Sequence, residues 1–376
     1  GVYGFQPITT DPNYLRAGVP NTPLGSGVGI PPICCPDSSK GRVPLPSESE
    51  MGYPVANREL HRGYIQSWNF IIEHKLPSNF VTSVGYVGTA SVNGFAFLDT
   101  NASQIPGSGD EGRPLFAKFG RTSTTREWDG RLHSTYHALQ ATINRRLSGG
   151  MFLKGAYTYS HAIDMADYSD WTEFRWNAAS QFSRNRAAAT HNIPHMFQLG
   201  YLYELPFGSG KKWATSGGAA AVLGGWQING VFSAYQGRQF TLTASDASLN
   251  MPGNQQTPDQ IKPKVEKLGK VGDDGTWFDT TAFARPTGAR FGTVGRNTMR
   301  GPGVVNTDLS LFRNFKLTEK FNLQFRAEAF NFSNTPHFAN PNGNVNSSNF
   351  GRISETQSAY AIARSREFRF GLRLGF

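Results

Sequence analysis

The sequence predicts an all-β protein, an antiparallel transmembrane β-barrel with long extracellular loops. The 376 residues include 42 Gly and 28 Phe but only 38% hydrophobic residues, a composition that favours strands joined by turns over helical bundles. Segments in which apolar and polar residues alternate occur in pairs along the chain. Tight turns join the members of a pair, whereas about thirty to sixty residues separate successive pairs, a rhythm typical of outer-membrane barrels.

The first four alternating segments form two pairs. Tyr64–Leu76 reads YIQSWNFIIEHKL, and a Pro-Ser-Asn turn leads into FVTSVGYVGTA, which begins at Phe80. The second pair consists of STYHALQATINRRL and MFLKGAYTYSHAI, joined through Ser148, Gly149 and Gly150. Because successive side chains of a strand point to opposite faces, each segment has one apolar and one polar face. On the third segment the apolar face holds Leu139, Ala141 and Ile143, and the polar face holds Gln140, Thr142 and Asn144.

Five further strands are expected in the second half of the chain. HMFQLGYLYEL is followed by GWQINGVFSAYQGRQFTLTA, which covers residues 225–244, and VVNTDLSLFRNFKL is joined to KFNLQFRAEAFNF through Thr318 and Glu319. The chain ends in the ninth segment, REFRFGLRLGF, whose polar face carries Arg369 and Arg373. Its apolar face consists of Phe368, Phe370, Leu372, Leu374 and Phe376. This alternating, aromatic-terminated strand resembles the signal that the barrel-assembly machinery of outer-membrane proteins reads.

The faces of these strands suit a membrane. No run of about eighteen apolar residues occurs, so no helix is expected to span a bilayer. A barrel strand instead presents an apolar face to lipid, while the inside of a wide barrel is wet. Aromatic residues near the strand ends suit the interfacial girdles of such barrels. These residues are Trp68, Tyr86, Tyr157, Tyr159, Tyr201, Tyr203 and Trp226.

Composition and motifs argue against several other functions. The net charge is +10, but the Arg residues are scattered and no recognition-helix pattern accompanies them, so we expect no nucleic-acid binding. The two cysteines, Cys34 and Cys35, are adjacent in a Pro-rich stretch and match neither a metal nor a redox spacing. His133 and His137 are four residues apart, but His137 lies in an alternating strand rather than on a helix. We therefore expect no metal, no cofactor and no enzymatic activity.

Strand parity leads to a domain assignment. Nine strands are predicted, whereas single-chain bacterial barrels have even strand numbers, so we expect an upstream partner strand outside this sequence. If the tight turns are periplasmic, residues 1–63 form an extracellular loop region, and their Pro, Gly and Ser content agrees with that. Residues 64–376 then form the C-terminal portion of an outer-membrane barrel, without a plug domain.

One predicted extracellular loop carries candidate ligand-contact residues within SHAIDMADYSDWTEF. Carboxylates of this loop have the chemistry to bind Ca²⁺, and its aromatic rings have the chemistry to stack on a sugar. The alternative is an ordinary solvated loop. The candidate residues are Asp164, Asp167, Tyr168, Asp170 and Trp171.

Several segments resemble one family over most of the chain, from about Arg62 to Phe376. They include YIQSWNFIIEHKLPSNFVTSVGYVGTA, ALQATINRRLSGGMFLKGAYTYSHAID, NIPHMFQLGYLYELPFGSGKKW and FGTVGRNTMRGPGVVNTDLSLFRNFKLTEKFNLQFRAEAFNF. These resemble the barrel hairpins of TonB-dependent receptors of the acidobacterial Oar-like type, which carry an N-terminal carboxypeptidase-regulatory-like domain. The resemblance implies a barrel of about twenty-two strands, a plug in its lumen and an upstream segment that contacts the TonB complex.

The leading hypothesis is thus a fragment of a receptor in the outer membrane of a Gram-negative bacterium. As the resemblance implies, such a receptor takes up a scarce or large nutrient, for example a metal chelate, glycan or peptide, with energy from the inner membrane. The implied partners are outer-membrane lipid and lipopolysaccharide, the barrel-assembly machinery, the TonB complex and an unknown nutrient. Two alternatives remain open: a non-transporting outer-membrane adhesin or structural barrel, and a soluble carbohydrate-binding β-sandwich.

Overall fold

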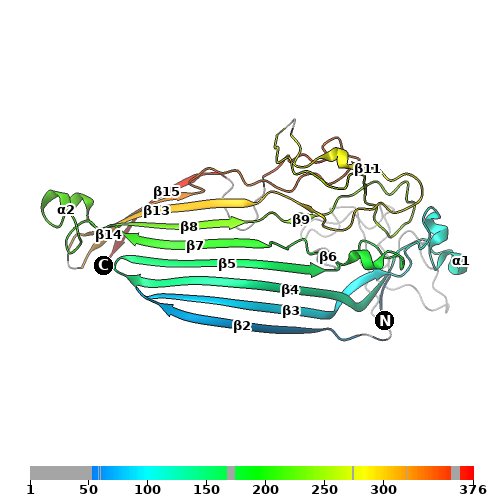
Figure 1. Cartoon of the computed structure of the whole chain (residues 1–376), viewed down its shortest axis with the longest axis horizontal. Coiled ribbons are helices and arrows are strands. Elements are labelled where there is room, and N and C mark those ends of the chain that lie inside the picture. The colour runs from blue at the N-terminus through cyan, green and yellow to red at the C-terminus, as the bar shows by residue number, and fades with distance from the viewer. Residues whose placement is uncertain are drawn as a thin grey trace, which may run out of the picture.

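Nine long strands form one antiparallel sheet in the computed structural model, which describes residues 53–57, 59, 61–166, 174–272, 275–318, 320–356 and 365–376 (Figure 1). The spatial order of the strands is β15-β14-β13-β8-β7-β5-β4-β3-β2. Each of the nine expected strands is present, so the predicted fold class is confirmed. The strands are β2 (Tyr64–Leu76), β3 (Phe80–Asp99), β4 (Thr125–Ser148), β5 (Met151–Asp164), β7 (His195–Glu204), β8 (Trp226–Tyr235), β13 (Val304–Lys316), β14 (Asn322–Phe330) and β15 (Glu367–Gly375).

Shorter elements complete the described chain. β1 (Tyr53–Ala56) pairs in parallel with β4, and β6 (Ala187–Ala188) pairs with β5. Two small sheets lie outside the main one: β10 (Asp259–Gln260) with β11 (Phe283–Ala284), and β9 (Gln239–Phe240) with β12 (Met299–Arg300). The helices are α1 (Phe116–Phe119) and α2 (Gly217–Leu223), with 3-10 turns η2 (Gly109–Gly112), η3 (Phe182–Asn185) and η4 (Thr280–Ala282). Among the described helices, none has the length and apolar character needed to cross a bilayer.

The connections within strand pairs lie at one end of the sheet and the connections between pairs at the other, as the loop rhythm predicts (Figure 1). Residues 77–79 join β2 to β3, and residues 149–150 join β4 to β5. Gly149 and Gly150 both have positive φ, 58° and 78°. A two-residue type I′ hairpin turn, whose twist matches that of the flanking strands, requires positive φ at both positions. The connection from β7 to β8, which contains α2, lies at this same turn end (Figure 1).

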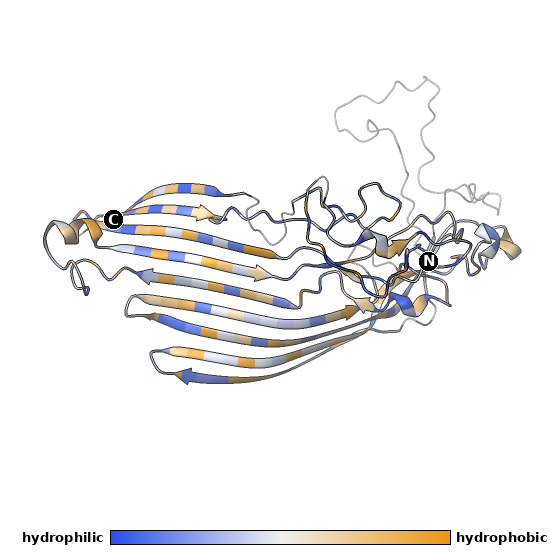
Figure 2. Ribbon diagram, turned by 45° about the horizontal axis from the view of Figure 1, so that its top comes forward, coloured by the Kyte–Doolittle hydropathy of each residue, from blue (hydrophilic) through white to orange (hydrophobic). Residues whose placement is uncertain are grey.

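One face of the sheet is apolar from edge to edge, and its strand register aligns apolar residues across neighbours. Phe70 lies opposite Tyr86, which lies opposite Leu139, which in turn lies opposite Tyr159. From Met151 to Tyr159, β5 advances about 26 Å at roughly 3.3 Å per residue, the height of the apolar band of an outer-membrane barrel. Figure 2 shows the alternation of hydrophobic and hydrophilic residues along the strands. Large apolar side chains on this face are exposed, Phe70 to 69% and Phe370 to 73%, as contact with lipid requires.

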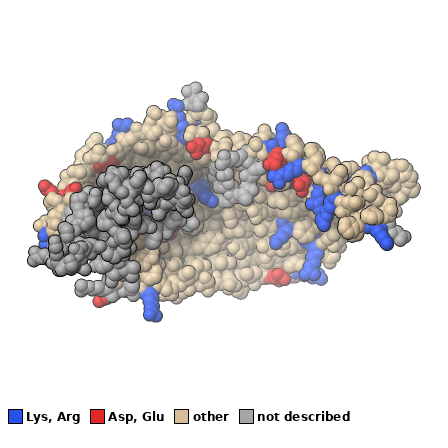
Figure 3. Space-filling view, turned by 180° about the vertical axis from the view of Figure 1, so that it is seen from behind, with Lys and Arg blue, Asp and Glu red and all other residues tan. Residues whose placement is uncertain are grey.

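The opposite face of the sheet is polar. Cross-strand neighbours on this face include Gln140 with Thr158 and Glu328 with Arg369. Such side chains suit the wet lumen of a wide barrel. Figure 3 shows a hollowed face of the molecule, with Lys and Arg side chains gathered toward the turn end.

The long connections pack into a folded layer at the other end of the sheet. We call the described parts of residues 100–124, 165–194, 236–303 and 331–356 the loop layer. Its main apolar core is made of buried side chains from segments far apart in sequence, so the layer is packed as a small globular domain is. These residues are Phe240, Leu242, Trp277, Phe278, Ala282, Phe283, Val294 and Ile353.

Three details differ from the sequence-based expectation. The segment 225–244 is not one strand, since β8 ends at Tyr235 and β9 leaves the main sheet to pair with β12. At this break the backbone of Gly237 packs directly against that of Gly301. A Cβ at position 237 would lie 1.9 Å from the carbonyl oxygen of Gly301. β3 and β4 have 20 and 24 residues, which carries them well past the apolar band to the loop layer. The described strands form a single main sheet rather than two stacked ones, so the β-sandwich alternative was wrong.

Candidate ligand-binding site

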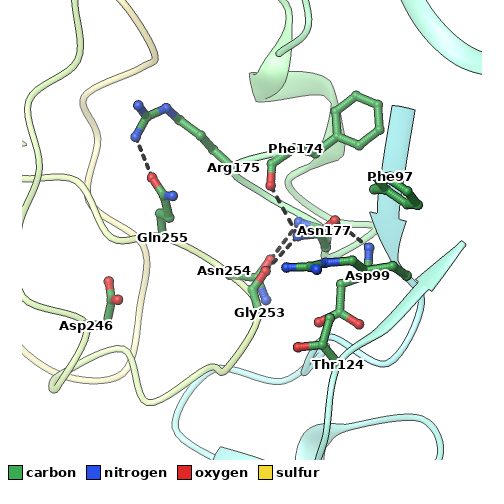
Figure 4. Close-up of a pocket in the computed structure, with 11 residues that line it drawn as sticks. Phe97, Asp99, Thr124, Phe174, Arg175, Asn177, Asp246, Gly253, Asn254 and Gln255 are labelled. Carbon is green, nitrogen blue, oxygen red and sulfur yellow. Dashed lines mark hydrogen bonds between the residues drawn. The ribbon is translucent and has the colours of Figure 1, made fainter. Parts of the chain in front are cut away.

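A pocket of about 300 Å³ opens in the loop layer, where the far ends of β3 and β4 meet two long connections (Figure 4). Its position follows from the length of β3, because 20 residues at roughly 3.3 Å each place Asp99 far beyond an apolar band of about 25 Å. The pocket lies at the lower end of the size range of small-molecule sites. Its lining is formed by Phe97, Asp99, Thr124, Arg126, Phe174, Arg175, Asn177, Asp246, Gly253, Asn254 and Gln255.

Asp99 is the carboxylate at the centre of the pocket's chemistry, and it is only 8% exposed. Its Oδ1 accepts hydrogen bonds from the backbone N–H groups of Asn101 and Thr125, both at 3.0 Å. Its Oδ2 is buried and has no hydrogen-bond partner within the described residues. A guanidinium nitrogen of Arg113 lies 3.9 Å from Oδ2, too far for a hydrogen bond.

The charge state of Asp99 reflects its burial. Loss of solvation raises the pKa of the Asp99 carboxyl above its ordinary value. The two backbone hydrogen bonds and the positive charges of Arg113 and Arg126 act in the opposite direction but do not cancel the effect of burial. The carboxylate therefore has compensating positive charge nearby but incomplete hydrogen bonding.

Side-chain amides hold the pocket wall in place. Asn177 accepts a hydrogen bond from the Asp99 backbone N–H at 2.9 Å and donates to the Gly253 carbonyl at 2.7 Å. Asn254 Oδ1 accepts from the N–H groups of Asn177 and Ala178 at 2.9 and 2.8 Å. These bonds join three segments that lie more than 70 residues apart in sequence, so the wall is pre-formed rather than a loose loop surface.

The remaining lining groups give the pocket a mixed character. In Figure 4 the Arg175 guanidinium donates to Gln255, at some distance from the neighbouring Asp99 and Thr124. Phe97 and Phe174 are only 8% and 5% exposed, and Phe174 packs in an apolar cluster with Ala96 and Met165. With two carboxylates and two guanidiniums in the lining, the formal charges balance. Such a site is able to hold a small polar ligand through several hydrogen bonds.

Of the ligand-contact residues proposed from the sequence, Asp164 lies at the end of β5. It is 9% exposed and pairs with the guanidinium of Arg296, which also donates to the Asp164 backbone carbonyl at 2.8 Å. Asp164 therefore ties β5 to the loop layer. The other candidates, Asp167, Tyr168, Asp170 and Trp171, lie outside the described residues, as do Cys34 and Cys35.

The apolar residues of the terminal strand lie where the alternation places them. Phe370 is opposite Ala327 and Leu372 is opposite Phe325, so they continue the apolar face onto β15. All five side chains are exposed, and Phe376 is the most exposed at 98%. Among the described strands, β15 and β2 are the two edges of the sheet and do not pair with each other.

Sequence reasoning missed the pocket residues. No local motif marks them, because Asp99, Asn177 and Asn254 come from three separate connections. The available signal was the change from the apolar run at Phe95–Leu98 to the polar run that starts at Asp99, which marks the end of a long strand.

The family that the sequence matches agrees with this architecture. A family model described as outer membrane beta barrel domain matches residues 2–369. No curated protein matches the chain in sequence. The outer membrane transporter YddB from Escherichia coli has a TM-score of 0.46 at 8% identity, over 86% of this chain and 34% of that chain.

Two further solved structures show similar values. The pyoverdine outer membrane receptor FpvA from Pseudomonas aeruginosa, bound to pyoverdine, has a TM-score of 0.39 at 11% identity, over 83% of this chain and 30% of that chain. The FpvAI–pyocin S2 complex has a TM-score of 0.40 at 11% identity, over 84% of this chain and 28% of that chain. The chain thus spans about a third of the length of these solved structures.

Proposed function

The chain belongs to the outer-membrane β-barrel domain family, and from this premise we propose that it is the C-terminal barrel portion of a TonB-dependent receptor of the Oar-like type. The protein is located in the outer membrane of a Gram-negative bacterium. In the proposed function the complete receptor takes up a scarce or large nutrient with energy from the inner membrane. The soluble alternative is excluded by this location.

The observation that carries the proposal is the open, two-faced sheet. Nine strands with a continuous apolar face lie side by side without closing on each other within the described residues. A barrel that contains these nine strands and more is wide, and its lumen is not filled by strand side chains alone. The polar inner face, with pairs such as Glu328 and Arg369, suits a lumen that holds water and a plug domain.

The orientation follows from the loop rhythm. Outer-membrane barrels place short turns in the periplasm and long loops outside the cell. The turn end therefore faces the periplasm, and the loop layer with its pocket faces the medium. In this arrangement the plug, the carboxypeptidase-regulatory-like domain and the TonB-contact segment belong to upstream parts of the receptor, and the nutrient enters from the loop-layer side.

Deletion of the gene in its native host tests the proposed uptake. Growth is compared on single metal chelates, oligosaccharides and peptides as limiting nutrients, beside a strain that lacks the TonB complex. We expect one nutrient class on which both strains fail and the complemented strain grows. Growth that depends on the gene but not on TonB contradicts energised uptake. Normal growth combined with lost attachment to surfaces favours the adhesin or structural barrel.

A further inference from the structure

We propose that helix α2 anchors the turn end of the sheet in the membrane interface, with its apolar side chains among phospholipid acyl chains and Lys212 at the headgroup phosphates. The partner of this surface is thus a phospholipid of the leaflet at the turn end. The inference goes beyond the proposed uptake, because contact with lipid depends on neither a nutrient nor the TonB complex. It rests only on the sheet spanning the membrane.

The first step concerns the composition of the β7–β8 connection. Residues 205–225 contain two lysines and no acidic residue, and α2 itself reads GGAAAVL, without a polar side chain. Val222 is exposed to 63%, and Leu223 and Trp213 are also exposed. Such apolar surface is unfavourable in water, whereas a lipid bilayer removes it from water. The composition of α2 therefore favours lipid as its surroundings.

The second step concerns the side of the sheet on which α2 lies. The Trp226 indole N–H donates to the Val222 carbonyl at 3.0 Å, and the Arg313 guanidinium donates to the Ala221 carbonyl. Trp226 and Arg313 are cross-strand partners. The Trp226 ring lies edge-to-face with Phe325, a residue of the apolar face, with ring centres 6.4 Å apart. The C-terminal end of α2 is thus fixed to the lipid-facing side of the sheet rather than to its lumen side.

The third step concerns how far the apolar face extends at the turn end. The chain continues past Arg313 to the β13–β14 turn, where Leu317 and Phe321 are exposed apolar side chains. Asn322 lies opposite Gly375, so the exposed Phe376 lies at about the level of this turn. Apolar surface therefore reaches beyond the point where α2 is fixed. The helix and the sheet present one continuous surface to lipid.

The fourth step concerns charge. Lys211 pairs with Glu204 at 2.6 Å, whereas the Lys212 ammonium lies 5.1 Å from the centre of the Trp213 ring. A tryptophan beside a lysine suits the headgroup level of a bilayer, where the ring meets the interface and the ammonium group reaches phosphate. Figure 3 shows further Lys and Arg side chains toward the turn end. A phospholipid supplies both the acyl chains and the anion that this surface fits.

The experiment measures the depth of Val222 in a bilayer. In the full-length protein every native cysteine is replaced by Ser, and Val222→Cys is labelled with the environment-sensitive fluorophore NBD. Ser209→Cys is the matched control, because Ser209 is exposed in the same connection but lies outside α2, between two glycines. Both proteins are reconstituted into vesicles of phosphatidylcholine and phosphatidylglycerol. Quenching by lipids with a doxyl group near the headgroup end of the acyl chain is compared with quenching by iodide on both sides of the membrane.

We expect the doxyl lipid to quench position 222 at least about twofold more strongly than position 209, because an interfacial helix buries its apolar side chains about 5–10 Å into the headgroup–acyl boundary. Iodide should show the reverse order. Should Val222→Cys fail to give a heat-modifiable barrel, Leu223→Cys takes its place. Equal iodide quenching at the two positions would place α2 in water and overturn the inference. Protection of position 222 from both quenchers would mean that protein covers α2, which also overturns it.

The phosphate contact is tested in the same assay. Lys212→Glu, added to the Val222→Cys protein, should lower doxyl quenching in vesicles that contain phosphatidylglycerol, because a carboxylate at this position repels the headgroup phosphates. Lys264→Glu is the control, since Lys264 is exposed in the loop layer, and it should leave the quenching unchanged. Unchanged quenching after Lys212→Glu would overturn the phosphate contact.

Discussion

Arg296 shows at the scale of one residue how the loop layer is fastened to the sheet. Its side chain is fully buried, pairs with Asp164 and donates to the backbone carbonyl of Asn185 at 2.8 Å. A buried guanidinium is stable only when its N–H donors have hydrogen-bond acceptors. Here the backbone carbonyls of two separate segments accept hydrogen bonds from Arg296. The alternation of β5 predicts a strand up to Asp164, but the partner 132 residues away has no local sequence signal.

Replacing Arg296 by Met tests this fastening. The change leaves the Asp164 carboxylate buried without its charge partner, so we expect the free energy of unfolding to fall by about 3–5 kcal/mol. Urea titration of the full-length protein in lipid vesicles measures it. Lys211→Met is the control, because Lys211 pairs with Glu204 where both side chains are more than a third exposed, so its loss should be much smaller. Equal losses in the two variants would contradict the assigned role of Arg296.

Asp259 makes a second residue-scale prediction, which concerns pH. Hydrogen bonds from Arg290 hold the pKa of the Asp259 carboxyl below its ordinary value, and the Thr293 N–H adds to this at 3.1 Å. Because the folded pKa is depressed, the contribution to stability is present above the unfolded pKa of about 3.9 and is lost as pH falls through the folded pKa.

Limited pepsin digestion of wild type and Asp259→Asn between about pH 2 and pH 5 measures this contribution. We expect the loop layer of the variant to be cleaved faster at the upper end of this range. The difference should shrink as the pH falls, since both proteins then lack the charge. A difference that grows toward low pH would contradict the pairing.

At the scale of elements, the alternating strands were predictable and their outer ends were not. Tyr64–Leu76 and the hairpin turn at Gly149 follow from period-two alternation and turn chemistry. The extension of β3 and β4 beyond the apolar band was missed. Polar and small residues there pack against loops instead of facing lipid, so the alternation of apolar and polar residues is lost. The break after Tyr235 was missed because it depends on a close approach to Gly301.

The two faces of β4 predict different effects of a substitution by arginine. Ile143 lies on the apolar face opposite Gly155, midway along the membrane-facing part of β5, whereas Gln140 lies on the polar face. Ile143→Arg should reduce the free energy of unfolding in lipid vesicles by about 2–4 kcal/mol, because an arginine would enter hydrocarbon. Gln140→Arg should be close to neutral in the same measurement. A larger loss for Gln140→Arg would reverse the assigned faces.

The terminal strand carries a prediction about assembly. Phe376 is almost fully exposed in this chain, so its loss removes little packing within the described residues. We expect Phe376→Ser in the full-length protein to reduce the amount of heat-modifiable barrel in the outer membrane, as a defect in recognition by the assembly machinery would. Phe119→Ser, at an exposed phenylalanine of the loop layer, is the control. Normal levels of folded barrel after Phe376→Ser would contradict the assembly role.

At the scale of the whole molecule, the chain has three parts in different surroundings: the lipid-facing side of the sheet, its lumen-facing side and the loop layer. The strands carry an apolar face for lipid and a polar face for the lumen, and the loop layer has a core of its own around Phe278. Composition and alternation were sufficient to predict the first two regions. The loop-layer core and its pocket depend on contacts between distant segments, which no single stretch of sequence encodes.

The central claim is that the chain spans the outer membrane with the loop layer outside the cell, and cysteine labelling in intact cells tests it most directly. In the full-length protein Cys34 and Cys35 are replaced by Ser, and a single Cys is introduced at exposed Lys264 in the loop layer or at exposed Ser209 at the turn end. With a membrane-impermeant maleimide, we predict labelling at position 264 in intact cells and at position 209 only after the outer membrane is permeabilised. Labelling of position 209 in intact cells, with position 264 protected, would contradict the account.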